Sequence, residues 1–146
     1  MPRRHSDPPK PTVTPARFSA LFSGGAALGR PLREEAGIEV LDPRQGEVEL
    51  AVTADLRNPA GTLQGALVAL LAEAAAEDLV ATRFESPAVV TDLDLRYLAQ
   101  AHEGPVRTTS RLLGSGPEAA VEVRLTDTSA QRLTTLVFAR LSPVRT

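Results

Sequence analysis

Residues 58–73 read N-P-A-G-T-L-Q-G-A-L-V-A-L-L-A-E, a polar turn that continues into an apolar run. Asn58, Pro59 and Gly61 are residue types that favour turns. From Leu63 onward, apolar residues recur three or four positions apart and proline is absent as far as Pro87, which predicts a long helix. The rest of the chain is expected to pack around this helix.

The start of the expected helix has the features of an oxyanion-binding site. Thr62 is the expected N-cap, because its hydroxyl can accept a free backbone N–H of the first turn. Gly65 then falls in that turn, where N–H groups lack intrahelical partners. A residue without a side chain lets a ligand oxygen approach the backbone, and the helix dipole attracts negative charge. Close packing of the helix start against a neighbouring element explains Gly65 equally well.

Three carboxylates follow within the same helix. Glu73 lies about two turns in, at the margin of the apolar stripe, where it could act as a base or nucleophile or simply be solvated. Glu77 lies one turn further on, so the two charges share one side of the helix. This repulsion would raise the pKa of Glu73. Alternatively, Glu77 accepts a polar or cationic part of a ligand, or forms a solvated helix end with Asp78.

The segment resembles the active-site segment of hotdog-fold acyl-CoA thioesterases of the phenylacetic-acid-degradation type. That family has roughly N-x-x-G-x-x-H-G-G, followed by a small-residue helix that carries Asp or Glu. The matching residues are Asn58, Gly61, Gly65 and Glu73. Gln64 stands where the family usually has His, and Ala66 replaces the second Gly. The resemblance covers residues 20–142, nearly the whole chain.

The resemblance implies hydrolysis of an acyl thioester without a metal or redox cofactor. Gly65 N–H would stabilise the oxyanion, and Glu73 would activate water or attack directly to form an anhydride. Asn58 would position the water or the thioester. Thr91, 18 residues after Glu73 and on the helix-facing side of its strand by alternation, would support the carboxylate.

Three further residues are expected to contact the substrate, namely Gln64, Gly61 and Glu77. Gln64 can donate a hydrogen bond to the thioester oxygen, or it can face a subunit interface. The substrate would be an acyl-CoA or an acyl-carrier thioester with an aryl or fatty acyl group. The alternative function is a non-catalytic hotdog module that binds acyl thioesters as a sensor or carrier partner.

Composition excludes several other functions. The chain has 146 residues, which is one domain's worth. It lacks cysteine, so disulfides, thiolate nucleophiles and zinc–thiolate sites are excluded. The net charge of −2 gives no reason to expect nucleic acid, and no apolar run is long enough for a membrane span. Without a signal peptide, a cytoplasmic location is expected. All basic residues except Lys10 are arginine, which is typical of a GC-rich bacterial genome.

The histidines and short motifs do not suit other enzyme classes. His5 lies in the N-terminal tail and His102 in a turn, and the sequence has neither G-x-S-x-G nor H-E-x-x-H. A serine triad, a metalloprotease site and the His–carboxylate pair of hotdog dehydratases are therefore not expected.

Along the chain, residues 1–14 are Pro-rich and are expected to form a disordered arm, and a short helix follows from Pro15. The remainder, 15–146, is expected to form a single domain. Alternating or apolar runs predict six strands, at 36–42, 47–53, 88–99, 106–113, 119–126 and 132–141. The last four are joined by short turns and are expected to form an antiparallel meander.

Two strands, one long helix and four further strands indicate an α+β architecture. This is the element order of the hotdog fold, in which a curved antiparallel sheet of about six strands wraps around one long central helix. One helix cannot cover a long sheet, and in the family the subunits pair. The resemblance therefore implies a homodimer or homotetramer with the site at the subunit interface.

Overall fold

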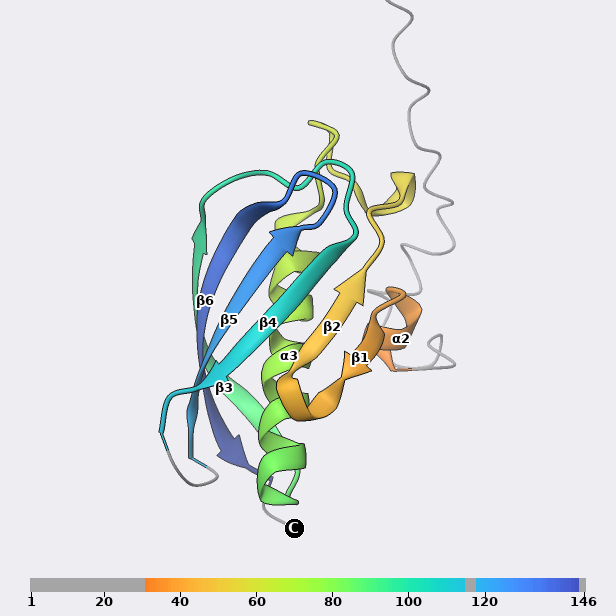
Figure 1. The fold of residues 1–146 in the computed structure, drawn as a ribbon. Helices are drawn as coiled ribbons and strands as arrows, with labels where there is room; N and C mark the ends of the chain where they lie inside the picture. Colours follow the sequence, from red (N-terminus) through yellow and green to blue (C-terminus); the bar gives the residue numbers. More distant parts are fainter. Residues whose placement is uncertain (1–30, 115–117, 145–146) are drawn as a thin grey trace, which may run out of the picture.

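The computed structural model describes residues 31–114 and 118–144, in which a six-stranded antiparallel sheet curves around helix α3 (Figure 1). The helices are α2 (Leu32–Glu35) and α3 (Gly65–Phe84), with 3₁₀ turns η1 (Pro43–Gln45) and η2 (Ala54–Leu56). The strands are β1 (Glu39–Asp42), β2 (Glu47–Leu50), β3 (Ala88–Tyr97), β4 (Val106–Leu112), β5 (Ala120–Asp127) and β6 (Arg132–Pro143). The predicted α+β architecture is confirmed. The expected arm at 1–14 and the helix from Pro15 lie outside the described residues.

The core lies between α3 and the concave face of the sheet. Helix α3 contributes small buried residues, so the strands can approach its backbone closely, and the sheet contributes mainly valine and leucine. The buried residues of α3 are Val68, Leu71, Ala72, Ala74, Ala75, Ala76, Leu79 and Val80. The alternation predicted for the second strand is confirmed, since Val48 and Leu50 are buried. No helix in the described parts of the chain is long and apolar enough to span a membrane.

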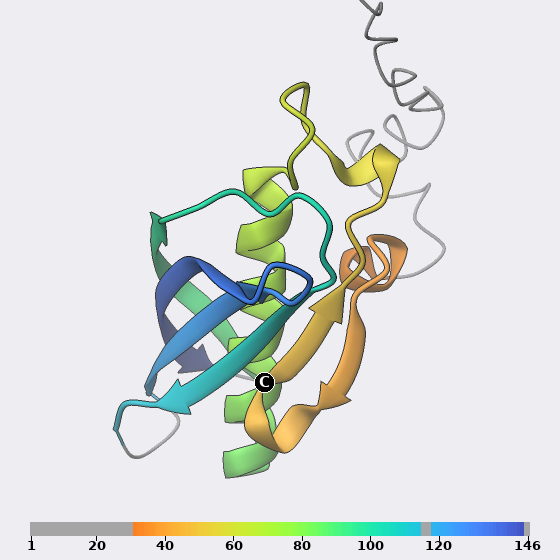
Figure 2. The same ribbon diagram turned by 45° about the horizontal axis from the view of Figure 1, so that its top comes forward.

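The strand order differs from the expected meander. The sheet runs β1-β2-β4-β5-β6-β3, so β3 pairs with β6 and not with β4. The connection at residues 98–105 therefore runs from the edge strand β3 past β6 and β5 to β4, near the N-terminal end of α3 (Figure 2). There the carbonyl of Ala101 accepts a hydrogen bond from Leu63 N at 2.9 Å. The crossing brings the end of β3 beside the start of α3.

A bulge in β3 corrects the predicted orientation of its first half. The register with β6 shifts between Val90 and Asp92, so the side-chain alternation changes phase there. Val89 is therefore exposed, whereas Val90 packs against the core. Thr91 lies in the bulge with its side chain exposed, and its hydroxyl donates to the carbonyl of Arg140 at 3.3 Å. The expectation that Thr91 faces the helix is wrong, whereas Leu93 packs against the core as predicted.

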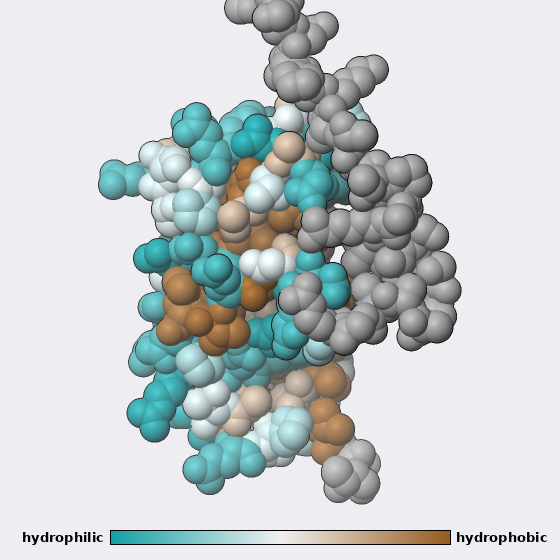
Figure 3. Space-filling view, turned by 90° about the vertical axis from the view of Figure 1, so that its right-hand side faces the viewer, coloured by the Kyte–Doolittle hydropathy of each residue, from teal (hydrophilic) through white to brown (hydrophobic). Residues whose placement is uncertain are grey.

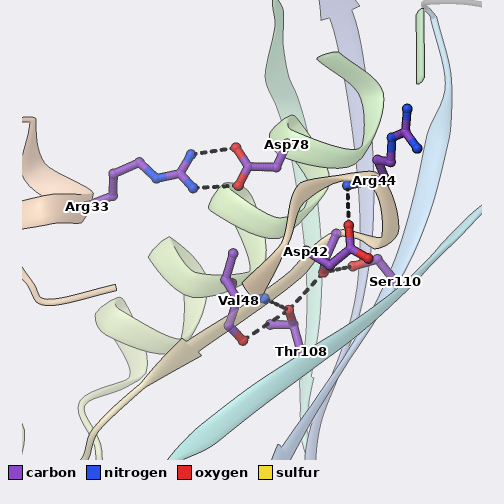
Figure 4. Close-up of polar contacts among 8 residues, drawn as sticks. Arg33, Asp42, Arg44, Val48, Asp78, Thr108 and Ser110 are labelled. Carbon is purple, nitrogen blue, oxygen red and sulfur yellow. Dashed lines mark hydrogen bonds and ion pairs between the residues drawn. The ribbon is translucent and has the colours of Figure 1, made fainter. Parts of the chain in front are cut away.

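Polar contacts fix the elements around the lower part of α3 (Figure 4). Arg33 of α2 forms a two-pronged ion pair with Asp78 of α3, at 2.9 and 2.7 Å. Beneath η1, the buried hydroxyl of Thr108 donates to the carbonyl of Gly46 and accepts from Val48 N, both at 2.9 Å. Asp78 is thus a structural residue, and only part of the helix end is solvated.

Asp127 holds the crossing connection in place. Its carboxylate is buried and accepts hydrogen bonds from the N–H groups of His102 and Gly104, at 3.1 and 3.0 Å. Burial alone would raise the pKa of Asp127, but the backbone N–H donors outweigh it and hold the pKa below its ordinary value. The ionised form is therefore the stabilising one. Its contribution is complete above pH ~4 and is lost as the pH falls through the lowered pKa.

We expect Asp127→Asn to lower the free energy of unfolding at pH 7 by about 1–3 kcal/mol, because buried N–H groups lose a charged acceptor. The difference from wild type should shrink as the pH falls below ~4. Urea denaturation at several pH values measures both effects. Glu118→Gln is the control, since Glu118 is an exposed carboxylate in the segment that precedes β5. The same loss and pH dependence in both variants would contradict the assignment to Asp127.

Candidate functional site

The loop that precedes α3 is organised by the side chain of Asn58. Its Oδ1 accepts three hydrogen bonds, from Ala60 N (3.0 Å), Thr62 N (3.2 Å) and Thr62 Oγ1 (3.1 Å). The backbone N–H of Asn58 donates to the carbonyl of Thr62 at 2.7 Å. These contacts hold the amide through Oδ1, and Nδ2 donates no hydrogen bond to a described residue. Asn58 thus both builds the loop and presents a free donor.

The N-cap of α3 lies two residues later in the chain than expected. Gln64 occupies the N-cap position of α3 without a side-chain capping bond, so the prediction of Thr62 as N-cap is wrong. The hydroxyl of Thr62 is instead used by Asn58. Gly61 has a φ of +80° and completes the turn, and its N–H donates to the carbonyl of Asn58 at 2.9 Å. The side chain of Gln64 is half-buried, and its part in substrate binding stays a prediction.

Gly65 is the first residue of α3 and so lies in the first turn of the helix, as predicted. Its N–H and that of Ala66 have no acceptor among the described residues, as expected for the first turn of a helix. Close packing also operates here, because a Cβ atom on Gly65 would lie 3.1 Å from the hydroxyl oxygen of Tyr97. That hydroxyl donates to the carbonyl of Gly65 at 3.0 Å. The side-chain position of Gly65 is therefore filled by Tyr97, whereas its N–H remains available.

A shallow pocket of about 250 Å³ lies beside this N–H group. It brings together Asn58 and Gly65 but not Glu73 or Thr91. Its lining residues are Asn58, Thr62, Leu63, Gly65, Val68, Tyr97, Ala99, Gln100, Ala101, Thr134 and Thr135. Sequence analysis missed the part played by Tyr97. The signal was the alternation in β3, which places Tyr97 on the same face as Leu95.

Glu73 lies in the middle of α3, away from this pocket. Its side chain is half-buried and has no hydrogen bond or ion pair with a described residue. It lies in a stripe of incompletely buried residues, Ala66, Ala69, Leu70, Glu73 and Glu77, along the side of α3 that the sheet leaves uncovered. Figure 3 shows several patches of hydrophobic surface among polar residues on one face of the molecule.

Glu77 contacts the edge strand. Its Oε1 accepts a hydrogen bond from Val90 N at 3.2 Å, next to the bulge in β3. Burial raises the pKa of Glu77, and the negative charge of Glu73 raises it further, while Val90 N–H and Arg33 act in the opposite direction. Glu77 thus ties α3 to β3. A contact between Glu77 and a substrate stays a prediction.

Comparisons with known proteins agree with this geometry. No protein-family model matches the chain. The sequence is 32% identical over 107 residues to 1,4-dihydroxy-2-naphthoyl-CoA hydrolase of Listeria monocytogenes, covering 70% of this chain and 87% of the relative. The PaaI protein of the phenylacetic acid degradation operon of E. coli has a TM-score of 0.69 at 17% identity, covering 88% of this chain and 91% of its own. A thioesterase of Haemophilus influenzae has a TM-score of 0.71 at 18% identity, covering 80% and 85%. The expected hotdog fold is confirmed.

The raised pKa of Glu77 predicts a pH-dependent change in stability. At a pH below 4.5, the ordinary pKa of a glutamate side chain, Glu77 is protonated in both the folded and the unfolded chain. As the pH rises through this value, the unfolded chain ionises first, so wild type loses stability. We expect Glu77→Gln, which keeps an acceptor for Val90 N–H, to lose less stability than wild type between pH 4 and pH 7. Urea denaturation at both pH values measures the difference.

The control for this measurement is Glu118→Gln, which removes an exposed carboxylate at the start of the segment leading into β5. It should follow the wild-type pH dependence. If Glu77→Gln also follows it, burial of Glu77 does not weaken the folded state.

Proposed function

We propose that this chain, which belongs to the hotdog-fold acyl-CoA thioesterases, uses Gly65 N–H and the Glu73 carboxylate to hydrolyse an acyl-CoA thioester. As a member of this family, the chain is a thioester hydrolase. The observation that carries the proposed mechanism is the unpaired Gly65 N–H at the start of α3, beside a pocket that also contains Asn58. The mechanism needs an oxyanion donor, an activated water and a way to hold the thioester.

The start of α3 supplies the donor. Gly65 N–H is free, and it lies at the positive end of a 20-residue helix, where developing negative charge is stabilised. Asn58 Nδ2 is a second free donor on the same pocket and can hold the attacking water or the thioester. The thioester carbonyl would therefore enter this pocket with its oxygen toward Gly65.

Glu73 supplies the carboxylate. In one route it takes a proton from water while the water oxygen attacks the carbonyl carbon. The tetrahedral oxyanion then collapses, the C–S bond breaks, and CoA leaves with the proton that Glu73 returns. In the other route Glu73 attacks the carbonyl carbon, the C–S bond breaks and the CoA thiolate leaves. Water then hydrolyses the resulting anhydride to the free acid and the Glu73 carboxylate, and the proton released from water converts the thiolate to the thiol. Both routes need the free, half-buried carboxylate that Glu73 provides.

One chain does not bring these groups together. Eight residues of helix separate Gly65 from Glu73, which is about 12 Å at a rise of ~1.5 Å per residue. An oxyanion donor and a base must both lie about 3 Å from their parts of one carbonyl group. Glu73 of a second copy, in contrast, can reach Gly65 if the two α3 helices lie antiparallel across a two-fold axis. The axis would then pass close to Ala69, midway between Gly65 and Glu73.

The open edge of β3 supports the same axis. Between Asp92 and Tyr97 this edge faces away from β6 and has no strand partner among the described residues. Two copies that pair here in antiparallel fashion would place their axis between Asp94 and Leu95. Because Tyr97 contacts Gly65 and Val90 contacts Glu77, the level of Ala69 on α3 corresponds to the level of Leu95 on β3. Helix and strand therefore indicate one common axis, and a homodimer is the smallest active unit.

The pocket favours an aryl acyl group over a long fatty chain. It is shallow, has a volume of about 250 Å³, and is lined by Leu63, Val68 and the ring of Tyr97. The relative from Listeria monocytogenes is named for a naphthoyl-CoA, an aryl thioester. A flat ring can lie against Tyr97, whereas an extended chain would leave most of its apolar surface in water.

Hydrolysis of a panel of acyl-CoAs, followed by release of free thiol, tests the proposed function. We expect wild type to hydrolyse aryl-CoAs such as benzoyl-CoA faster than palmitoyl-CoA. Glu73→Gln should lower kcat by about 10² or more while KM changes little, because the variant keeps the shape of the side chain but lacks the base.

Glu118→Gln serves as the control for charge removal and should keep the wild-type kcat. A wild-type protein that binds acyl-CoA without turnover would be the non-catalytic module. If wild type turns over but Glu73→Gln retains most of its kcat, the base lies elsewhere and Glu77 is the next candidate.

Subunit mixing tests the composite site. Asn58→Ala and Glu73→Gln should each be nearly inactive alone. After exchange of equal amounts, half of the dimers are mixed, and each mixed dimer has one intact site and one doubly damaged site. Activity should therefore recover to about a quarter of wild type. No recovery, with exchange verified by native mass spectrometry and both variants folded by circular dichroism, would place each site within a single chain.

A further inference from the structure

The side chain of Tyr97 reaches from the end of β3 to the first peptide of α3. Its hydroxyl donates to the carbonyl of Gly65 at 3.0 Å. The same oxygen lies 3.1 Å from the position that a Cβ atom on residue 65 would take. Tyr97 is 59% exposed, so its hydroxyl could be satisfied by water and burial does not demand this contact. The contact nevertheless joins the sheet to the peptide group next to the proposed oxyanion donor.

We propose that Tyr97 is a positioning residue that orients and polarises the first peptide group of α3 for oxyanion binding. The carbonyl of Gly65 and the N–H of Ala66 belong to one amide. A hydrogen bond donated to that carbonyl therefore fixes the direction of the N–H and makes it a stronger donor. This N–H has no acceptor among the described residues, and neither does that of Gly65. The inference rests on the proposed function, because it concerns how the same carbonyl-binding site is held.

The carbonyl of the preceding peptide group also accepts hydrogen bonds, in this case from the helix itself. The N–H of Gly65 shares its amide with the carbonyl of Gln64, which accepts from Leu67 N at 3.0 Å and from Val68 N at 3.2 Å. That amide is therefore held by the helix itself. Tyr97 adds a tether from outside the helix to the next amide. Two successive N–H groups at the start of α3 are thus supported through the carbonyls of their own amides, one by α3 alone and one with the help of β3.

The glycine at position 65 fits this role. The Tyr97 hydroxyl lies 3.1 Å from the position of a Cβ atom on residue 65, which is closer than an ordinary contact, so a side chain there would push the hydroxyl away by a few tenths of an ångström. The nearest ring carbon is 3.4 Å from the same Cβ position, which is ordinary contact. Removal of the hydroxyl should therefore relieve the steric restriction on residue 65 while it abolishes the tether.

Tyr97→Phe tests the proposal, because it removes the hydroxyl and keeps the ring. Kinetics use the acyl-CoA that wild type hydrolyses fastest. We expect kcat to fall about tenfold, less than for direct loss of an oxyanion donor, with KM within about twofold and an unchanged melting temperature. Thr109→Val, which removes an exposed hydroxyl from β4, is the matched control and should keep the wild-type kcat.

A spectroscopic measurement reports on the carbonyl directly. Phenacyl-CoA is a stable thioether whose ketone can occupy the carbonyl site without being hydrolysed. The infrared stretch of the bound ketone should lie at lower wavenumber in wild type than in Tyr97→Phe, because stronger hydrogen bonds weaken the C=O bond. A purely structural tether would leave this frequency unchanged.

A double-mutant cycle with Gly65→Ala gives an independent readout. In the wild-type background, Gly65→Ala should push the Tyr97 hydroxyl away from its position, weaken its hydrogen bond to the carbonyl of residue 65 and lower kcat. In the Tyr97→Phe background, the added methyl meets only ordinary contacts, so its further effect on kcat should be smaller. The two effects should therefore be less than additive.

The outcomes separate this inference from the proposed function. An active wild type with unchanged kcat and unchanged ketone frequency in Tyr97→Phe would overturn the role of Tyr97 alone. Loss of kcat without a change in ketone frequency, or strictly additive effects in the cycle, would also overturn it. A wild type that hydrolyses no thioester would overturn both proposals.

Discussion

The rise of an α-helix is the constraint on which the proposed chemistry depends. α3 carries its free N–H groups at one end and its unpartnered carboxylate about two turns later, so their separation is fixed by backbone geometry at about 12 Å. No side-chain rearrangement closes that distance within one chain. Because the sheet covers one side of α3, a second group can come close to the Gly65 N–H only from the uncovered side of the helix. Under the proposed mechanism, this separation along α3 requires that a second chain supply Glu73.

Small side chains make the enclosure possible. The buried face of α3 is rich in alanine, which lets the strands lie close to the helix, and the larger residues of the core come from the sheet. The polar contacts lie at the margins of this core. Arg33 holds the lower part of the helix through Asp78, and Asp127 holds the crossing connection that passes its upper end. The start of α3 is thus fixed by neighbours, which suits a site that binds a short-lived charge.

Sequence patterns predicted the parts of the fold that depend on local periodicity. The long helix with Gly65 in its first turn, the alternation of Val48 and Leu50, and six strands around one helix were all predictable. The misplaced cap and the orientation of Thr91 depend on features that periodicity does not encode. Asn58 competes for the Thr62 hydroxyl, and the bulge inserts one residue into the alternation. Strand order was missed because turn residues mark where a chain bends but do not show which strand it joins.

The bulge in β3 also bears on aggregation. An unpaired strand edge can recruit further strands without limit, and proteins protect such edges. Here the N–H of Val90 donates to the Glu77 side chain, so it is not available to pair with a strand of another molecule at that end of the edge. Among the described residues, the part of this edge toward Tyr97 has no strand partner, and it is short enough to pair along its whole length with one antiparallel strand. Pairing with one such strand would leave no unpaired segment on the β3 edge, so no further strand could add to the sheet there.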